Sequence, residues 1–120
     1  METTYRPFAV LTAGGRDYRL KITTNSAIEA EKKLGTSLAR AWLRLDEVQV
    51  QTVILHAALQ GFEPGMTFEA AAAVRDSFIA EGGDMDALAD IFKEVYICSG
   101  FMKRETPKEQ EAPGAPQEQS

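Results

Sequence analysis

Residues 46–60, DEVQVQTVILHAALQ, decide the fold of this chain. Asp46 can cap a helix at its start, and Gly61 supplies a stop directly after Gln60. The predicted helix is apolar over most of its surface, and its polar side chains form one narrow stripe: Gln49, Thr52, His56 and Gln60. Because a helix of this kind must be covered on most sides, we expect it near the centre of a helical bundle.

Upstream of this helix, two short strand-like runs flank a glycine turn. Residues 7–12 (PFAVLT) and 17–23 (DYRLKIT) are separated by a turn that contains Gly14 and Gly15, which take positive φ at low cost. In the second run apolar and charged side chains alternate, which is typical of a half-buried antiparallel strand. We therefore predict a β-hairpin over about 7–23, docked on the helices because a lone hairpin is marginal in water.

The remaining helices are predicted from their caps. Ser26 and Glu29 have the spacing of a capping box, which predicts a helix that starts at Ser26 and ends at Leu34, before Gly35. Three further helices begin at other capping residues: Thr36 or Ser37, Thr67, and Asp84. The predicted fold is α+β and mainly α, with an N-terminal antiparallel hairpin packed on a bundle of four to five short helices.

The apolar pattern stops at Met102. Residues 103–120, KRETPKEQEAPGAPQEQS, contain no large apolar side chain and are rich in Pro, Glu and Gln. Such a segment cannot bury enough apolar surface to offset the entropy lost on ordering. We therefore predict one compact domain over residues 1–102 and a disordered polar tail over 103–120.

Composition limits the classes of partner. The chain has 120 residues and a net charge of −5, which argues against nucleic acid and anionic membranes as partners. Its apolar runs are far shorter than the roughly 20 residues of a membrane span. The N-terminus lacks the basic and apolar segments of a secretory signal. A single cysteine, Cys98, excludes an internal disulfide and suits a reducing cytoplasm.

No arrangement of residues predicts catalysis. His56 is the one histidine, and it lies on the polar stripe of its helix without further metal ligands nearby in sequence. Cys98 is predicted to point into the core from another helix. Gly14 and Gly15 follow a strand but open no helix, so they do not form a phosphate loop. We expect no catalytic, cofactor or metal site, and hence not an enzyme.

Apolar side chains in or next to loops are candidates for a recognition surface. Phe62, Met66, Phe101 and Met102 occupy such positions, and exposed aromatic and Met side chains suit adaptable binding. Phe62 and Phe101 each follow a helix-stopping glycine, where a local hydrophobic cap is the alternative interpretation.

Three stretches carry a resemblance to a known family. They are 18–23 (YRLKIT) leading into 27–35 (AIEAEKKLG), then 55–60 (LHAALQ), and finally 95–102 (VYICSGFM), of which Ser99-Gly100-Phe101 is the most characteristic part. In order, spacing and total length the chain resembles the small tail assembly chaperones of long-tailed bacteriophages and related prophages.

The resemblance implies a function and its partners. Such chaperones bind the long, largely helical tape measure protein, keep it soluble, and help bring tail tube proteins to it. They act in the host bacterial cytoplasm and are absent from the mature virion. The family often makes a longer product by a ribosomal frameshift, and this chain would be the short form or a single-form member. Self-association stays open.

The apolar side chains near loops and the alanine face indicate where such a partner would bind. We expect it around the loop from Phe62 to Phe68, the face of residues 70–73, and the end of the last helix. The proposed contact residues are Phe62, Met66, Phe68, Ala71, Phe101 and Met102. Two rival functions remain: a structural phage morphogenesis protein, such as a head–tail connector or minor tail protein, and a bacterial protein–protein adaptor that uses the edge of its hairpin.

Overall fold

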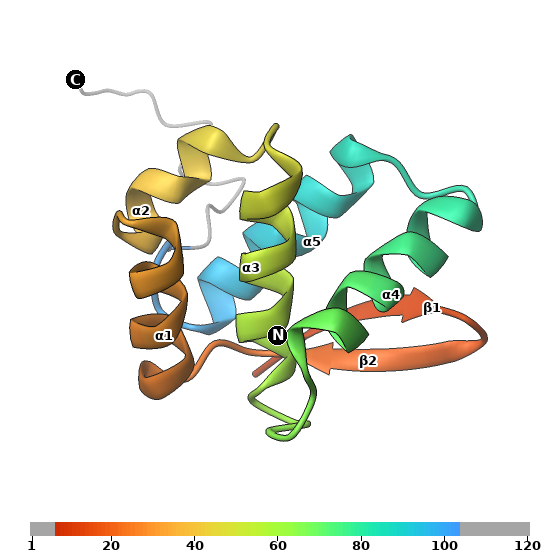
Figure 1. The fold of residues 1–120 in the computed structure, drawn as a ribbon, viewed down its shortest axis with the longest axis horizontal. Coiled ribbons are helices and arrows are strands. Elements are labelled where there is room, and N and C mark those ends of the chain that lie inside the picture. The colour runs from red at the N-terminus through yellow and green to blue at the C-terminus, as the bar shows by residue number, and fades with distance from the viewer. Residues whose placement is uncertain (1–6, 104–120) are drawn as a thin grey trace, which may run out of the picture.

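The computed structural model describes residues 7–103, which form a hairpin and a mainly helical body (Figure 1). The elements in chain order are β1 (Ala9–Ala13), β2 (Arg16–Leu20), α1 (Thr24–Leu34), α2 (Leu38–Ala41), the 3-10 helix η1 (Trp42–Arg44), α3 (Val48–Leu59), α4 (Phe68–Ala80) and α5 (Met85–Cys98). This confirms the predicted α+β, mainly α fold with an N-terminal antiparallel hairpin. Of the predicted tail, residues 104–120 lie outside the described residues.

Helix α3 lies at the centre of the body, as predicted. In Figure 1 it stands between α1 and α4, with α5 behind it. Nine of its twelve residues are buried, and they include the polar Gln51 and Thr52. Both polar side chains are satisfied locally: Gln51 Nε2 donates to the carbonyl oxygen of Leu45 at 2.6 Å, and Thr52 Oγ1 donates to that of Val48 at 2.8 Å. The apolar surface of α3 is therefore covered on most sides.

The start of α3 differs from the prediction. Glu47, not Asp46, is the N-cap residue, and its side chain makes no capping hydrogen bond. The Glu47 carboxylate instead accepts two hydrogen bonds from Arg44, each 2.9 Å long. A charge-assisted bidentate pair of this kind competes successfully with a cap, because it uses both carboxylate oxygens.

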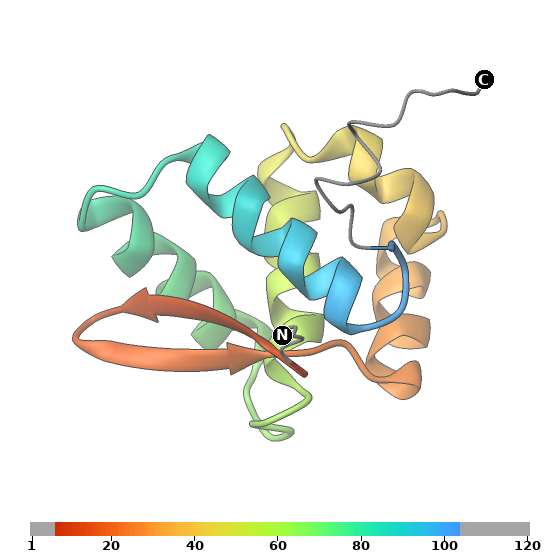
Figure 2. The ribbon, with the colours of Figure 1, turned by 180° about the vertical axis from the view of Figure 1, so that it is seen from behind.

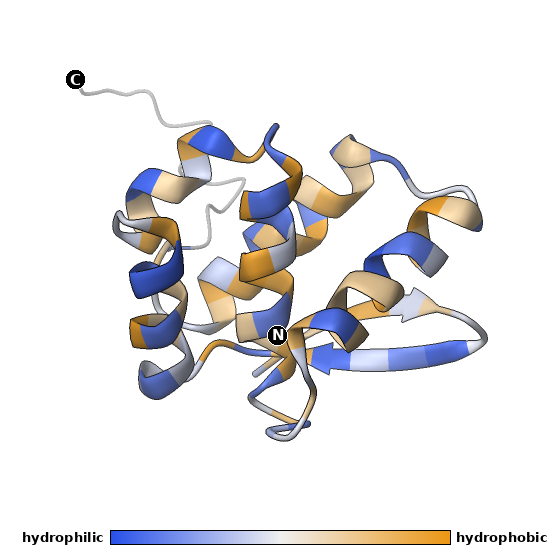
Figure 3. Ribbon diagram, in the orientation of Figure 1, coloured by the Kyte–Doolittle hydropathy of each residue, from blue (hydrophilic) through white to orange (hydrophobic). Residues whose placement is uncertain are grey.

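The hairpin packs beneath the helices. Ala13 pairs with Arg16 across a two-residue turn in which Gly14 and Gly15 have φ of 62° and 73°. These positive angles are those of a type I′ turn, which matches the twist of the flanking strands. The inner face of β1 is buried against α4 and α5 (Figure 2), whereas β2 is mostly hydrophilic (Figure 3). The predicted docking of the hairpin is confirmed.

Helix α1 begins earlier than predicted. Its N-cap is Thr23, whose Oγ1 accepts from the Ser26 amide at 3.1 Å, while Ser26 Oγ accepts from the Thr23 amide at 3.0 Å. The capping box therefore joins Thr23 and Ser26, and the prediction that Ser26 pairs with Glu29 was wrong. The end of α1 is as predicted, since Gly35 takes a left-handed conformation with φ of 70°.

The other predicted caps are present. Ser37, Thr67 and Asp84 each accept a hydrogen bond from the backbone amide three residues on, at the starts of α2, α4 and α5. At the end of α5 the Phe101 amide donates to the carbonyl oxygen of Tyr96 at 2.7 Å, which folds Phe101 back onto the last turn. No helix in the described part of the chain is both long and apolar enough for a membrane span.

Candidate protein-binding site

A groove of about 540 Å³ lies between α1 and α3, open to solvent on one side. The two helices run side by side in opposite directions, because α2 and η1 join them at one end (Figure 1). Residues from both helices and from the loop after α3 line the groove: Thr23, Asn25, Ser26, Glu29, Ala30, Lys33, Val53, His56, Ala57, Gln60, Gly61 and Pro64. Its volume is as large as that of many small-molecule pockets.

The floor of the groove consists of short apolar side chains. Ala30 of α1 and both Val53 and Ala57 of α3 line it, and each is almost completely buried. Because Ala30 and Ala57 have short side chains, they leave space between the two helices on the solvent side of their contact. A partner could therefore bring its side chains close to the backbone of both helices.

Among the described residues, one charged side chain on the rim of the groove forms no ion pair. Glu29 forms an exposed ion pair with Lys32, with 3.6 Å between Nζ and Oε2. Within residues 7–103, Lys33 Nζ has no carboxylate within ion-pair distance, and it lies 4.7 Å from the centre of the Phe68 ring. This contact is a cation–π interaction between α1 and α4. Lys33 is thus a positive charge held at the groove by an aromatic ring.

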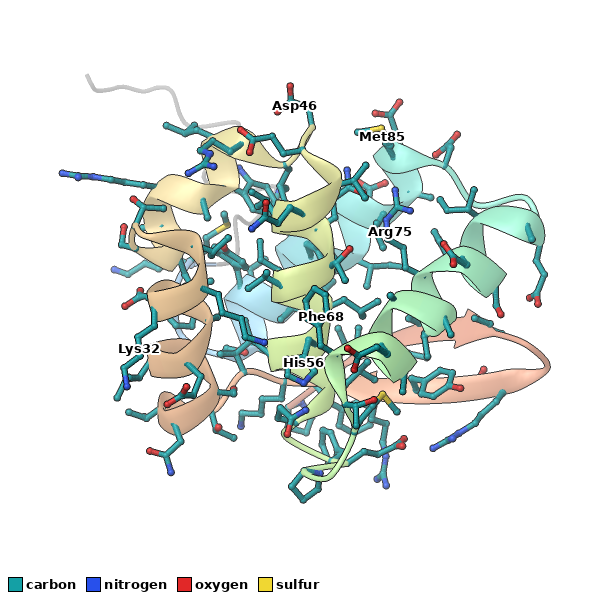
Figure 4. The ribbon with its side chains drawn as sticks, in the orientation of Figure 1. Lys32, Asp46, His56, Phe68, Arg75 and Met85 are labelled. Atoms are coloured by element: carbon teal, nitrogen blue, oxygen red, sulfur yellow. The ribbon has the colours of Figure 1, made fainter. Side chains whose placement is uncertain are left out.

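His56 faces Phe68 on the other side of the groove (Figure 4). The two rings meet edge to face with 5.8 Å between their centres. His56 Nε2 lies 3.0 Å from the carbonyl oxygen of Met66, and Gln60 Nε2 donates to the same oxygen at 2.8 Å. Because a carbonyl oxygen only accepts, His56 Nε2 is the donor in this contact. His56 is half-buried on the polar stripe of α3, and its hydrogen bond connects the loop before α4 to α3.

The same loop also contacts the hairpin. Phe62 packs edge to face on Phe8, with 5.6 Å between ring centres, and Arg19 of β2 lies 4.6 Å from the Phe62 ring centre. The next residue, Glu63, forms an ion pair with Arg16 of β2. Phe62 is 37% exposed, so part of its ring remains accessible beside these contacts.

The six residues proposed for binding do not form one surface. Phe62, Met66 and Phe68 belong to the loop after α3 and the start of α4, whereas Phe101 and Met102 follow α5. Phe101 packs on Tyr96, with 5.6 Å between ring centres, and is 39% exposed. Figures 1 and 2 place the end of α5 near α1 and α2, and the loop after α3 at the end of the molecule beside β2.

Ala71 needs a correction. It is completely buried in the core of the chain, so its side chain offers no contact to a partner. The spacing of α4 explains its burial, because Ala71 lies at i, i+3 and i+7 with Val74 and Phe78 on the face that packs against the core. Met66, Phe68 and Met102 are half-buried and pack against the core.

Cys98 lies in the core, as predicted. Its thiol contacts the carbonyl oxygens of Val95 and Leu20, at 3.5 and 3.8 Å, and burial raises the pKa of the thiol. His56 hydrogen-bonds elsewhere, at the loop before α4. Among residues 7–103 no three His, Cys, Asp or Glu side chains are grouped so that they could hold a metal ion.

Sequence reasoning missed the groove itself. Ala30, Lys33 and Ala57 were not among the proposed contacts, although they lie within the two stretches 27–35 and 55–60 that carry the family resemblance. Small residues in an otherwise apolar helix were the available signal of an open packing surface. Comparison of the chain with protein-family models, curated proteins and solved structures gave no match.

Proposed function

We propose that this protein is a tail assembly chaperone of a long-tailed bacteriophage or prophage. In this role it binds the tape measure protein, keeps it soluble, and helps bring tail tube proteins to it during tail assembly. It works in the host bacterial cytoplasm and is not a component of the mature virion. The proposal rests on the sequence resemblance and on where the resembling stretches lie in the fold.

One observation carries the proposal. Stretch 27–35 forms most of α1 and stretch 55–60 forms the end of α3, so the two lie on opposite walls of the groove. They contribute Ala30 and Lys33 from one wall and His56, Ala57 and Gln60 from the other. Two of the three resembling stretches therefore meet at an open apolar surface, where a protein partner could bind, whereas the third, 95–102, does not line the groove.

The groove suits the physical task of such a chaperone. A long helical protein that waits for its tube exposes apolar surface and is prone to aggregate. A small acidic domain can cover part of that surface by helix-in-groove binding and adds negative charge to the complex. Several copies on one long partner would also benefit from their proximity to one another.

Co-expression tests the proposal. The chain is produced together with the large helical protein encoded just downstream of it, and the soluble fraction of that protein is compared with a culture that expresses an unrelated acidic protein of similar size. We expect solubility that depends on this chain, and co-elution of the two proteins in size-exclusion chromatography. An unchanged soluble fraction without co-elution contradicts the proposal, as does finding the chain as a stoichiometric component of purified virions.

A bacterial adaptor is a second candidate, favoured by the edge of β1. The turn at residues 14–15 places Val10 and Thr12 at positions whose backbone groups face away from β2. β1 carries no charged side chain, and an uncharged edge is open to addition of a partner strand. Thr12→Pro removes one edge amide; loss of partner binding in this variant would favour the adaptor over the chaperone.

A further inference from the structure

We infer that the α1–α3 groove binds an amphipathic helix of the partner, and that an acidic side chain of this helix pairs with Lys33. The inference rests on the proposed function only in that the partner is helical. It adds where the helix lies, which part of it is apolar and which charge it carries.

The dimensions of the groove favour a helix. α1 and α3 have 11 and 12 residues, so the walls are about 16–18 Å long and can lie along about three turns of a helix. Their small floor residues, Ala30 and Ala57, permit the close axial distances of packed helices. A site for a small molecule would enclose most of its ligand, whereas this groove is open along one side.

The charges on the rim favour an acidic side chain. The Glu29 carboxylate already pairs with Lys32, and Asn25, Ser26 and Gln60 on the two walls carry no charge. Within the described residues this leaves Lys33 as the lining charge without an opposite charge. The chain as a whole is acidic, so a positive charge at this groove also directs where an acidic partner residue can bind.

Phe68 holds Lys33 in place for this contact. The ring lies beneath the ammonium group from the start of α4, and His56 packs against the ring edge. The ammonium is exposed at this position and still has donors free for a carboxylate. A partner helix seated in the groove would exclude water from the pair and strengthen it relative to an exposed ion pair.

The test uses the full purified chain and a display library of helical peptides of about 20 residues, with randomised side chains on a constant helical background. We expect the selected peptides to have apolar residues at i, i+3, i+4 and i+7 and an Asp or Glu at one fixed position beside this stripe. Their binding should fall about five- to tenfold with Lys33→Glu. The matched control is Lys93→Glu, which makes the same change of charge at an exposed position of α5 outside the groove lining, and should change binding by less than about twofold.

A second measurement does not depend on any variant. Amide chemical shifts of the ¹⁵N-labelled chain should move with a selected peptide at Ala30, Lys33 and Ala57, and stay unchanged at Leu43, which is 83% exposed on η1. Shifts confined to the Phe62 loop or to β1, selected peptides without a preferred charge, or equal effects of Lys93→Glu and Lys33→Glu would each overturn the inference.

The two proposals can fail separately. If the tape measure protein is solubilised but Lys33→Glu and Ala57→Leu leave the complex intact, the chaperone function stands and the groove inference is wrong. If the co-expressed protein gains no solubility while selected acidic helices bind the groove, the inference stands and the chaperone function is wrong. Circular dichroism shows whether the Ala57→Leu variant is folded. If it is unfolded, the Lys33→Glu variant alone tests whether the partner binds in the groove.

Discussion

The hydroxyl of Tyr96 on α5 donates a 2.6 Å hydrogen bond to the carbonyl oxygen of Leu38 on α2, 58 residues earlier in the chain. Both residues are buried, and the Tyr96 ring also packs against Trp42, with 5.1 Å between ring centres. This contact fixes the short segment of α2 and η1 on the body of the molecule. Since α2 and η1 connect α1 to α3, the contact also supports the end of the groove.

Removing this hydroxyl should destabilise the fold. Tyr96→Phe leaves the buried Leu38 carbonyl without its donor, and we expect the free energy of unfolding to fall by about 1–3 kcal/mol. Urea unfolding followed by circular dichroism measures the change. Tyr18→Phe is the control, because Tyr18 is half-buried and its hydroxyl has no hydrogen bond within residues 7–103. Equal stability of Tyr96→Phe and wild type would show that the bond contributes nothing net.

Stability should also fall at high pH because of Tyr96. Burial, and then the negative charge of Glu31, raise the pKa of Tyr96 in the folded chain. The unfolded chain then loses this proton at lower pH than the folded chain, so the stabilisation is complete below about pH 10 and is lost as the pH rises above it. Unfolding free energies from pH 8 to 11 should decline more steeply for wild type than for Tyr96→Phe. The pKa of Cys98 is also raised and has the same effect on stability, but Cys98 is present in both chains. The difference between the two pH dependences therefore reports Tyr96 alone.

Gly61 should not tolerate a side chain. A Cβ atom there would collide with the carbonyl oxygen of Lys21, where the chain leaves β2 and the Lys21 amide bonds to Ala58 at 2.9 Å. Because the obstacle is backbone, we expect Gly61→Ala to cost about 1–3 kcal/mol. Gly65→Ala, in the same loop but with open space around it, should be neutral or stabilise by up to about 1 kcal/mol. Thermal unfolding compares the two, and a similar melting temperature would contradict the close approach.

The two helix starts at which prediction and structure differ give a matched pair of substitutions. Thr23→Ala removes both the side-chain acceptor and its part of the capping box, and should lower the free energy of unfolding by about 1 kcal/mol. Asp46→Ala removes a carboxylate that caps nothing, and should change stability by less than about 0.5 kcal/mol. Guanidinium unfolding of both variants measures these changes. A larger loss of stability for Asp46→Ala than for Thr23→Ala would show that Asp46 caps α3 after all, as the sequence predicts.

Local sequence signals were sufficient to predict those turns and helix ends whose interacting groups are close along the chain. Each of these features depends on residues no more than a few positions away: the turn at Gly14 and Gly15, the caps at Thr67 and Asp84, and the helix end at Gly35. The apolar surface of the central helix likewise required burial, whatever covered it. These features follow from backbone geometry and from hydrophobic burial, so they could be predicted before the packing was known.

The candidate site could not be predicted in this way. At the start of α3 the Glu47 carboxylate bonds to Arg44 and therefore does not cap the helix. In α4 the packing of the helix against the core buries Ala71, which was proposed as a contact residue. The cation–π contact between Lys33 and Phe68 joins residues 35 positions apart only because α1 and α4 both pack beside α3.

The sequence by itself therefore determined the hairpin, the order of the helices and the burial of the central one, because period and caps are local properties. Only the tertiary structure decided that α1 and α3 leave a groove with Lys33 at its rim. The physical reason is that an open space between two helices depends on which small side chains face each other across the packing interface. The groove is lined by residues from 23 to 33 and from 53 to 64. The sequence of either segment alone does not show that the two lie side by side.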